Sequence, residues 1–162
     1  AETVSRLLSQ IECPACPPFN RTAGRAHSGR MRPMHKLLLV DDLGIDLMLT
    51  SLAIEQCCGG SDRVSITTAG DGEQAYQAIA AGGFDLLLLD IKMPRVDGFE
   101  LLERLHANGV AQPPVIILSG SGLAADRQRA SALGAIDYIQ KAVDYTGFKR
   151  ELKVTLERHG FL

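Results

Sequence analysis

Short apolar runs alternate with segments of helical periodicity from residue 36 to the end of the chain. Five such runs predict strands: residues 36–40, 64–68, 86–89 and 115–118, and a brief one around Tyr138. The run 86–89 is apolar without alternation, which a half-exposed strand does not tolerate but a central parallel strand requires. Strands that alternate with helices are typical of an α/β fold, in which helices cover both faces of a parallel sheet.

The segments between the strands predict helices with identifiable ends. The first helix has apolar residues at i, i+3, i+4, i+7 and i+8, which predicts one buried face: Ile45, Met48, Leu49, Leu52 and Ala53. Gly59 is expected to end it, and Asp71 and Asp97 are expected to cap the second and third helices. A small fourth helix is expected over residues 123–133. The last helix, from about 147 to 159, should bury residues at four-residue spacing: Phe148, Leu152 and Leu156.

Residues 1–33 differ from the rest of the chain. Proline and glycine interrupt them repeatedly, and they show no sustained apolar period, so we expect a flexible N-terminal extension followed by one domain over residues 34–162. Met31 and Met34 are both plausible start positions. Deleting residues 1–33 is therefore expected to leave melting nearly unchanged.

Composition and charge exclude several classes of protein. A hydrophobic content of 46% over 162 residues is ample for one core. The formal net charge of -2 offers no basic patch, so direct binding of nucleic acid is not expected. The apolar runs fall far short of the roughly 20 residues that span a bilayer, and no signal peptide is recognisable, so we expect a cytoplasmic protein without a membrane segment.

The chain has four cysteines: Cys13, Cys16, Cys57 and Cys58. A secreted disulfide scaffold would need more of them in a shorter chain, so we expect them to be reduced. Cys13 and Cys16 have the spacing of half a zinc site, but no second ligand pair follows at a suitable distance. Cys57 and Cys58 are expected to pack at the end of the first helix.

Charged or hydroxylic residues stand at the downstream ends of four predicted strands. Asp41 and Asp42 follow the first strand, Asp90 the third, Ser119 the fourth and Lys141 the fifth. In an open parallel sheet, ligands bind outside the carboxyl ends of the strands, so these residues should converge there. The pattern predicts a single site for phosphate and metal.

This ordered set resembles the receiver domain of two-component response regulators, over roughly residues 35–162. The run from Asp90 to Gly98 is similar to the segment that follows the family's phosphorylated aspartate, and Ser119 and Lys141 come in the family's order. The resemblance implies a flavodoxin-like, doubly wound, five-stranded parallel sheet in the order 2-1-3-4-5, with five helices.

The resemblance also implies the chemistry of the site. Asp90 would accept a phosphoryl group from a phosphohistidine on a sensor histidine kinase or phosphotransfer protein. Mg²⁺ would be bound by Asp41, Asp42, Asp90 and the backbone carbonyl of Lys92, in keeping with its preference for oxygen ligands. Lys141 would pair with the phosphoryl oxygens. The protein would then be a phospho-accepting signalling protein rather than an enzyme, although it would support its own phosphotransfer and autodephosphorylation.

The resemblance further assigns a switch and an output surface. The Ser119 hydroxyl would bind the new phosphate, and Tyr138 would follow it inward. Because we expect no effector domain after residue 162, the surface of the fourth helix, fifth strand and fifth helix would then contact an unknown downstream protein or form a homodimer.

Three alternatives compete with this interpretation. A haloacid-dehalogenase-type phosphatase would need a second aspartate two residues after the nucleophile, where this chain has Lys92. A flavodoxin-like cofactor binder would need a phosphate-binding loop after the first strand, where two carboxylates stand instead. A pseudo-receiver that only docks partners would usually lack the acceptor or the acidic pair, and both are present.

Two positions depart from the family pattern. Most receivers have proline where this chain has Ala142, and a small residue such as alanine where it has Gly120. Because a cis peptide costs roughly 2.5–4 kcal/mol before a residue other than proline, we expect a trans bond between Lys141 and Ala142.

The run from Val40 to Asp46 is similar to that of single-domain regulators paired with phytochrome-type kinases. The kinase, the signal, the target and the lifetime of the phosphate are open.

Overall fold

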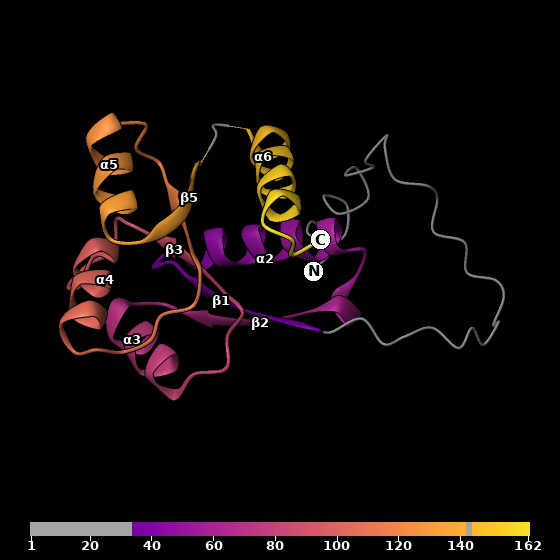
Figure 1. Ribbon diagram of the computed structural model, residues 1–162. Coiled ribbons are helices and arrows are strands. Elements are labelled where there is room, and N and C mark those ends of the chain that lie inside the picture. The colour runs from indigo at the N-terminus through magenta and orange to yellow at the C-terminus, as the bar shows by residue number, and fades with distance from the viewer. Residues whose placement is uncertain (1–33, 142–143) are drawn as a thin grey trace, which may run out of the picture. The chain divides into compact units, whose positions relative to one another are not determined.

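Five parallel strands form one sheet in the computed structural model, which describes residues 34–141 and 144–162 (Figure 1). The strands are β1 (His35–Val40), β2 (Val64–Ala69), β3 (Leu86–Asp90), β4 (Val115–Ser119) and β5 (Ala135–Gln140). Their order in the sheet is β2-β1-β3-β4-β5, and all four pairings are parallel. The predicted strand order is confirmed.

Five α-helices cover the two faces of this sheet in the described part of the chain. They are α2 (Gly44–Cys58), α3 (Gly72–Ala81), α4 (Gly98–Ala107), α5 (Ala124–Ala132) and α6 (Tyr145–Arg158), with a short 3-10 turn over Ser61–Arg63. Figure 1 shows α2 and α6 on one face, and α3, α4 and α5 on the other. The predicted fourth and fifth helices are therefore α5 and α6.

The central strands are apolar on both sides because each side faces a layer of helices. Leu87 and Leu89 of β3 belong to the core beneath α3, α4 and α5. Leu86 and Leu88, at the alternate positions, belong to the core beneath α2 and α6. All four side chains are fully buried, which explains why the run lacks polar alternation.

Side-chain caps start two helices as predicted. The Asp71 carboxylate accepts a hydrogen bond from the Gln74 backbone N–H at 2.8 Å, and Asp97 accepts one from Glu100 at 2.8 Å. The Gln74 side chain in turn accepts a bond from the Gly70 backbone N–H at 3.2 Å. These caps fix where α3 and α4 begin, immediately after the loops that follow β2 and β3.

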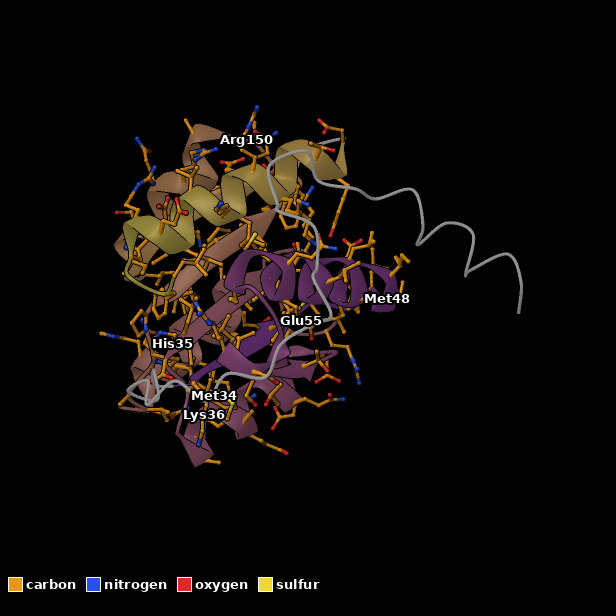
Figure 2. All side chains as sticks on the ribbon, turned by 90° about the vertical axis from the view of Figure 1, so that its right-hand side faces the viewer. Met34, His35, Lys36, Met48, Glu55 and Arg150 are labelled. Carbon is orange, nitrogen blue, oxygen red and sulfur yellow. The ribbon has the colours of Figure 1, made fainter. Side chains whose placement is uncertain are left out.

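The predicted buried face of α2 is wrong at Ile45, Met48 and Leu49, whereas Ala53 is fully buried as predicted. Ile45 and Met48 have exposed fractions of 56% and 60%, and Leu49 is also exposed. The buried residues of the helix are Thr50, Ala53, Ile54 and Cys58. Apolar residues occur around most of the circumference of α2, so their spacing alone does not determine which side meets the sheet. Ile45, Met48 and Leu49 therefore form an apolar strip at the surface of α2. Figure 2 labels Met48, which belongs to this strip, and Glu55 of the same helix.

The C-terminal part of the fold is close to the prediction, with β5 longer than expected. Six residues form this strand, because a strand at the edge of the sheet tolerates the polar residues that made its apolar run look brief. Asp144 caps α6 by accepting a bond from the Gly147 N–H at 2.7 Å. The predicted buried residues of α6 are confirmed: Phe148, Leu152 and Leu156.

Cys57 and Cys58 are the last two residues of α2, and Cys58 packs in the core beneath α2 and α6. Cys13 and Cys16, together with the predicted extension over residues 1–33, lie outside the described residues. Of the helices that are described, none has the length and apolar character to cross a membrane.

Candidate functional site

Three carboxylates meet at the carboxyl edge of the two central strands. Asp41 follows the end of β1, Asp90 is the last residue of β3, and Val40 pairs with Leu89 in the sheet, so Asp41 and Asp90 leave it at the same level. Together with Asp42 they offer oxygen atoms that all lie within 4.8 Å of one another. We call these three residues the carboxylate cluster. Asp41 and Asp90 are buried, and Asp42 is partly exposed.

Backbone contacts fix the positions of the two buried residues of the cluster. The Asp41 N–H donates to the Ala69 carbonyl at 3.1 Å, and its side chain accepts a bond from the Leu43 N–H at 2.9 Å. On the other strand, Gly98 begins α4 directly against Asp90. A Cβ at residue 98 would overlap the Asp90 carbonyl oxygen, so this close approach of helix and strand requires glycine.

Lys141 brings a positive charge into the cluster. Its ammonium lies 2.6 Å from Asp41, 3.2 Å from Asp90 and 3.1 Å from a fourth carboxylate, that of Asp46. The Lys141 backbone N–H donates to the Ser119 carbonyl at 2.7 Å. This bond holds Lys141 beside the last residue of β4. An ammonium has three N–H donors, and here three carboxylates surround it.

The charges in this site perturb one another. Burial raises the pKa of Asp90, and the negative charges of Asp41 and Asp42 add to that rise, while Lys141 opposes it. Burial also acts to lower the pKa of Lys141, but the hydrogen bond to Asp41 and the charge of Asp90 outweigh it and raise the pKa above its ordinary value. Lys141 therefore stays charged, and Asp90 is held in an electrostatically unfavourable position.

The carboxylate cluster fits a hard divalent cation. Mg²⁺ prefers oxygen ligands and is usually held by a few carboxylates together with water. Burial raises the pKa of Asp90, and the repulsion from Asp41 and Asp42 adds to this rise; a divalent cation in the cluster would offset that repulsion. Lys92, whose carbonyl is the fourth predicted ligand, lies exposed in the loop immediately after the cluster.

Ser119 and Tyr138 are linked through the loop that follows β4. Ser119 is fully buried, and its hydroxyl accepts a bond from the Ser121 N–H at 3.1 Å. The Tyr138 hydroxyl donates to the Ser121 carbonyl at 2.7 Å. Tyr138 is itself buried, so its ring lies under this loop rather than at the surface. The predicted hydroxyl and aromatic residues thus share one short chain of contacts.

Two further residues of the site were not predicted from the sequence. Asp46 lies in the first turn of α2 and pairs with Lys141, and its signal was a position four residues after Asp42 in a helix that begins at the site. Arg127 of α5 lies with its guanidinium carbon 4.5 Å from the centre of the Tyr138 ring and donates to the Tyr138 carbonyl at 3.3 Å. No sequence signal indicated that contact. The prediction about the Lys141–Ala142 bond lies outside the described residues.

A family model described as the response regulator receiver domain matches residues 37–153. The transcriptional regulatory protein CpxR of Klebsiella pneumoniae is 38% identical over 125 residues, which cover 77% of this chain and 50% of CpxR.

Solved structures agree with the fold. The chemotaxis protein CheY4 of Vibrio cholerae has a TM-score of 0.64 and 26% identity, covering 78% of this chain and 98% of that one. The phosphorylated cyanobacterial phytochrome response regulator RcpA has a TM-score of 0.65 and 25% identity, covering 77% and 93%. Several of the curated bacterial regulators are longer: the chain spans 13%, 50% and 54% of the length of three of them.

Proposed function

The chain belongs to the response regulator receiver domain family, and from its site we propose that it accepts a phosphoryl group on Asp90 with Mg²⁺ bound beside it. The donor would be a phosphohistidine on a sensor histidine kinase or a phosphotransfer protein. The observation that carries the proposal is the ammonium of Lys141, which lies within 3.2 Å of both Asp41 and Asp90 in a cluster of carboxylates. Because such donors form where ATP is available, this role implies a location in the cytoplasm.

The proposed reaction is a transfer from nitrogen to oxygen. A carboxylate oxygen of Asp90 attacks the phosphorus of the phosphohistidine, the P–N bond breaks, and the imidazole nitrogen leaves with the electron pair. Asp41, Asp42, Asp90 and the Lys92 carbonyl would hold Mg²⁺, which supplies positive charge to the phosphoryl oxygens. Lys141 supplies a second positive charge there. Attack of water on the phosphorus of the aspartyl phosphate then returns Asp90 and releases inorganic phosphate.

The proposed output runs through Ser119 and Tyr138. The Ser119 hydroxyl would turn to the new phosphoryl group, and the contacts through Ser121 would carry that change to Tyr138. We define the output face as the exposed surface of α5, β5 and α6. It contains a groove lined mainly by charged residues, namely Arg127, Asp137, Asp144, Arg150, Glu151 and Arg158. We propose that a downstream protein, or a second copy of the chain, binds this face.

The donor protein would contact the apolar strip of α2. Ile45 and Met48 of this strip, and Leu43 immediately before α2, are all more than half exposed, and they are close in sequence to Asp46, which reaches into the site. A protein that presents a phosphohistidine to Asp90 has to cover the rim of the site, and an exposed apolar rim favours such a contact. The similarity to RcpA supports a phytochrome-type kinase as the donor.

A small-molecule donor tests the acceptor directly. With Mg²⁺ and acetyl phosphate, the wild-type protein should gain one acid-labile phosphoryl group, and Asp90→Asn should gain none, as measured by intact mass. Asp126→Asn, an acidic residue in the first turn of α5, is the matched control and should behave as wild type. Stoichiometric modification of Asp90→Asn would show that the acceptor lies elsewhere.

The role of the apolar strip on α2 is tested by comparing phosphoryl transfer from a histidine kinase with transfer from acetyl phosphate. Met48→Asp should slow transfer from a phosphorylated histidine kinase by roughly tenfold or more, because a charge replaces an apolar contact. It should leave modification by acetyl phosphate unchanged. Val154→Asp on α6, also an exposed apolar residue, is the control. Equal slowing by both substitutions would remove α2 as the donor contact.

A further inference from the structure

We propose that Asp46 is a positioning residue that competes with the phosphoryl group for Lys141 and thereby limits how tightly the site holds that group. The inference rests on the proposed function, because it concerns the same ammonium. It assigns a regulatory contact to a residue outside the carboxylate cluster, since Asp46 is not among the three grouped carboxylates that could hold a metal.

The contact is well defined in the structure. The Asp46 carboxylate accepts a hydrogen bond from the Lys141 ammonium at 3.1 Å, although the two residues lie 95 positions apart. Its side chain is 30% exposed, whereas that of Asp41 is 2% exposed. Asp46 belongs to the first turn of α2, which starts at Gly44 immediately beside the cluster. The helix therefore fixes its position relative to Lys141.

The Lys141 ammonium has too few N–H donors to keep all its carboxylate contacts and also bind a phosphoryl group. Its three N–H groups face three carboxylates before phosphorylation: those of Asp41, Asp46 and Asp90. A phosphoryl group on Asp90 adds oxygens that carry more charge than the carboxylate did, so at least one existing contact has to weaken. Asp41 has the shortest contact, at 2.6 Å, and it is buried where water does not replace a lost partner.

Asp46 is therefore the contact that gives way. It has the longer distance of the two carboxylates that stay unmodified, and its greater exposure lets water hydrate it once Lys141 moves. The stronger its hold on Lys141, the less of that charge reaches the phosphoryl group. Removing the Asp46 charge should then strengthen binding of the phosphoryl group.

Beryllofluoride, an analogue of the phosphoryl group, provides a readout that requires no reaction. In saturating Mg²⁺, titration followed by fluorine NMR should show about fivefold tighter binding to Asp46→Asn than to wild type, the size expected for one partly exposed ion pair. Asp46→Glu restores the charge and should stay within roughly twofold of wild type. Asp126→Asn, a partly exposed acid in the first turn of α5, is the matched control and should show no change.

A double-mutant cycle separates competition for Lys141 from simple repulsion of anions. If Asp46 acts through Lys141, the gain from Asp46→Asn should disappear when Lys141→Met is also present, although binding is weaker throughout. A general repulsive field would give the same gain in both backgrounds. Thermal melting of each variant confirms that it is folded.

The outcomes are distinct. Unchanged or weaker binding by Asp46→Asn, or an equal gain with and without Lys141, overturns the role of Asp46 and leaves the proposed function intact. If wild type binds no beryllofluoride in Mg²⁺ while Asp90 is unmodified by acetyl phosphate, the proposed function fails, and this inference fails with it.

Discussion

Two carboxylates of the site, those of Asp41 and Asp90, are almost completely buried, whereas most charged groups of the output face lie at the surface. The Asp41 and Asp90 side chains are 2% and 7% exposed, and one ammonium serves both. On the output face, Asp137 pairs with Arg158 at 2.7 Å and with His159 at 3.0 Å, and the Arg158 side chain is 59% exposed. The same residue types therefore have different energetic weight in the two regions.

Burial explains the difference. A charge removed from water depends on the partner that replaces the water, so the loss of one partner in the site affects every group around it. An exposed charge is rehydrated when its partner is lost, and its ion pair contributes little. The site is thus suited to respond to one added phosphoryl group, and the output face is suited to exchange partners at small cost.

The largest effect is expected from Lys141→Met. It leaves Asp41 and Asp90 without their counter-charge, so the free energy of unfolding in urea should fall by about 2–4 kcal/mol at pH 8 without Mg²⁺. Lys153→Met, which loses an exposed pair with Glu157, should cost less than about 0.5 kcal/mol. Equal losses for the two variants would contradict the distinction between buried and exposed charges.

Asp90→Asn should stabilise the protein at high pH. Burial, with the charges of Asp41 and Asp42, raises the pKa of Asp90 in the folded state. The stability that protonated Asp90 contributes is fully present at pH values below its ordinary pKa of about 3.9. This contribution is lost as the pH rises through the pKa of Asp90 in the folded state. At pH 8 without Mg²⁺, the variant should therefore be more stable by about 1–3 kcal/mol.

This gain should shrink as the pH falls towards 4, because protonated Asp90 no longer carries the buried charge. Urea unfolding of both proteins at steps from pH 4 to pH 8 measures it. A difference that is constant over this range would mean that the ionisation of Asp90 is not its cause.

Tyr138→Phe tests the link between the two regions. It leaves the Ser121 carbonyl without its donor at a buried position, so unfolding in urea should show a loss of about 1–2 kcal/mol. Tyr145→Phe is the control, since its hydroxyl lies 3.5 Å from the Leu49 carbonyl near the surface and should contribute less than about 0.5 kcal/mol. A loss no larger than that of the control would show that the hydroxyl does not hold the loop.

Apart from the control variants, the smallest effect is expected from Asp137 on the output face. Asp137→Asn weakens the pairs with Arg158 and His159, which are partly exposed, so the free energy of unfolding should fall by only about 0.5–1 kcal/mol. Thermal melting at pH 7 measures it. A loss as large as that of Lys141→Met would place a buried, coupled charge on this face and remove the contrast with the site.

The order of the strands was implied by the family resemblance of the sequence, and the positions of the polar residues followed from the ends of its apolar runs. A parallel sheet brings the carboxyl ends of its strands to one edge, so Asp41, Asp90 and Lys141 converge whatever their distance along the chain. The caps at Asp71 and Asp97 were predictable for a similar reason, because a cap depends on residues three positions apart.

Only the tertiary structure decided which side of α2 is buried and what Asp46 and Arg127 contact. α2 is apolar on several sides, and the sheet and α6 select the side that bears Ala53 and Ile54. Asp46 meets Lys141 across 95 residues, and Arg127 meets the ring of Tyr138 between α5 and β5. Such contacts depend on the distance and rotation between packed elements, and the periodicity of a single segment carries no information about either.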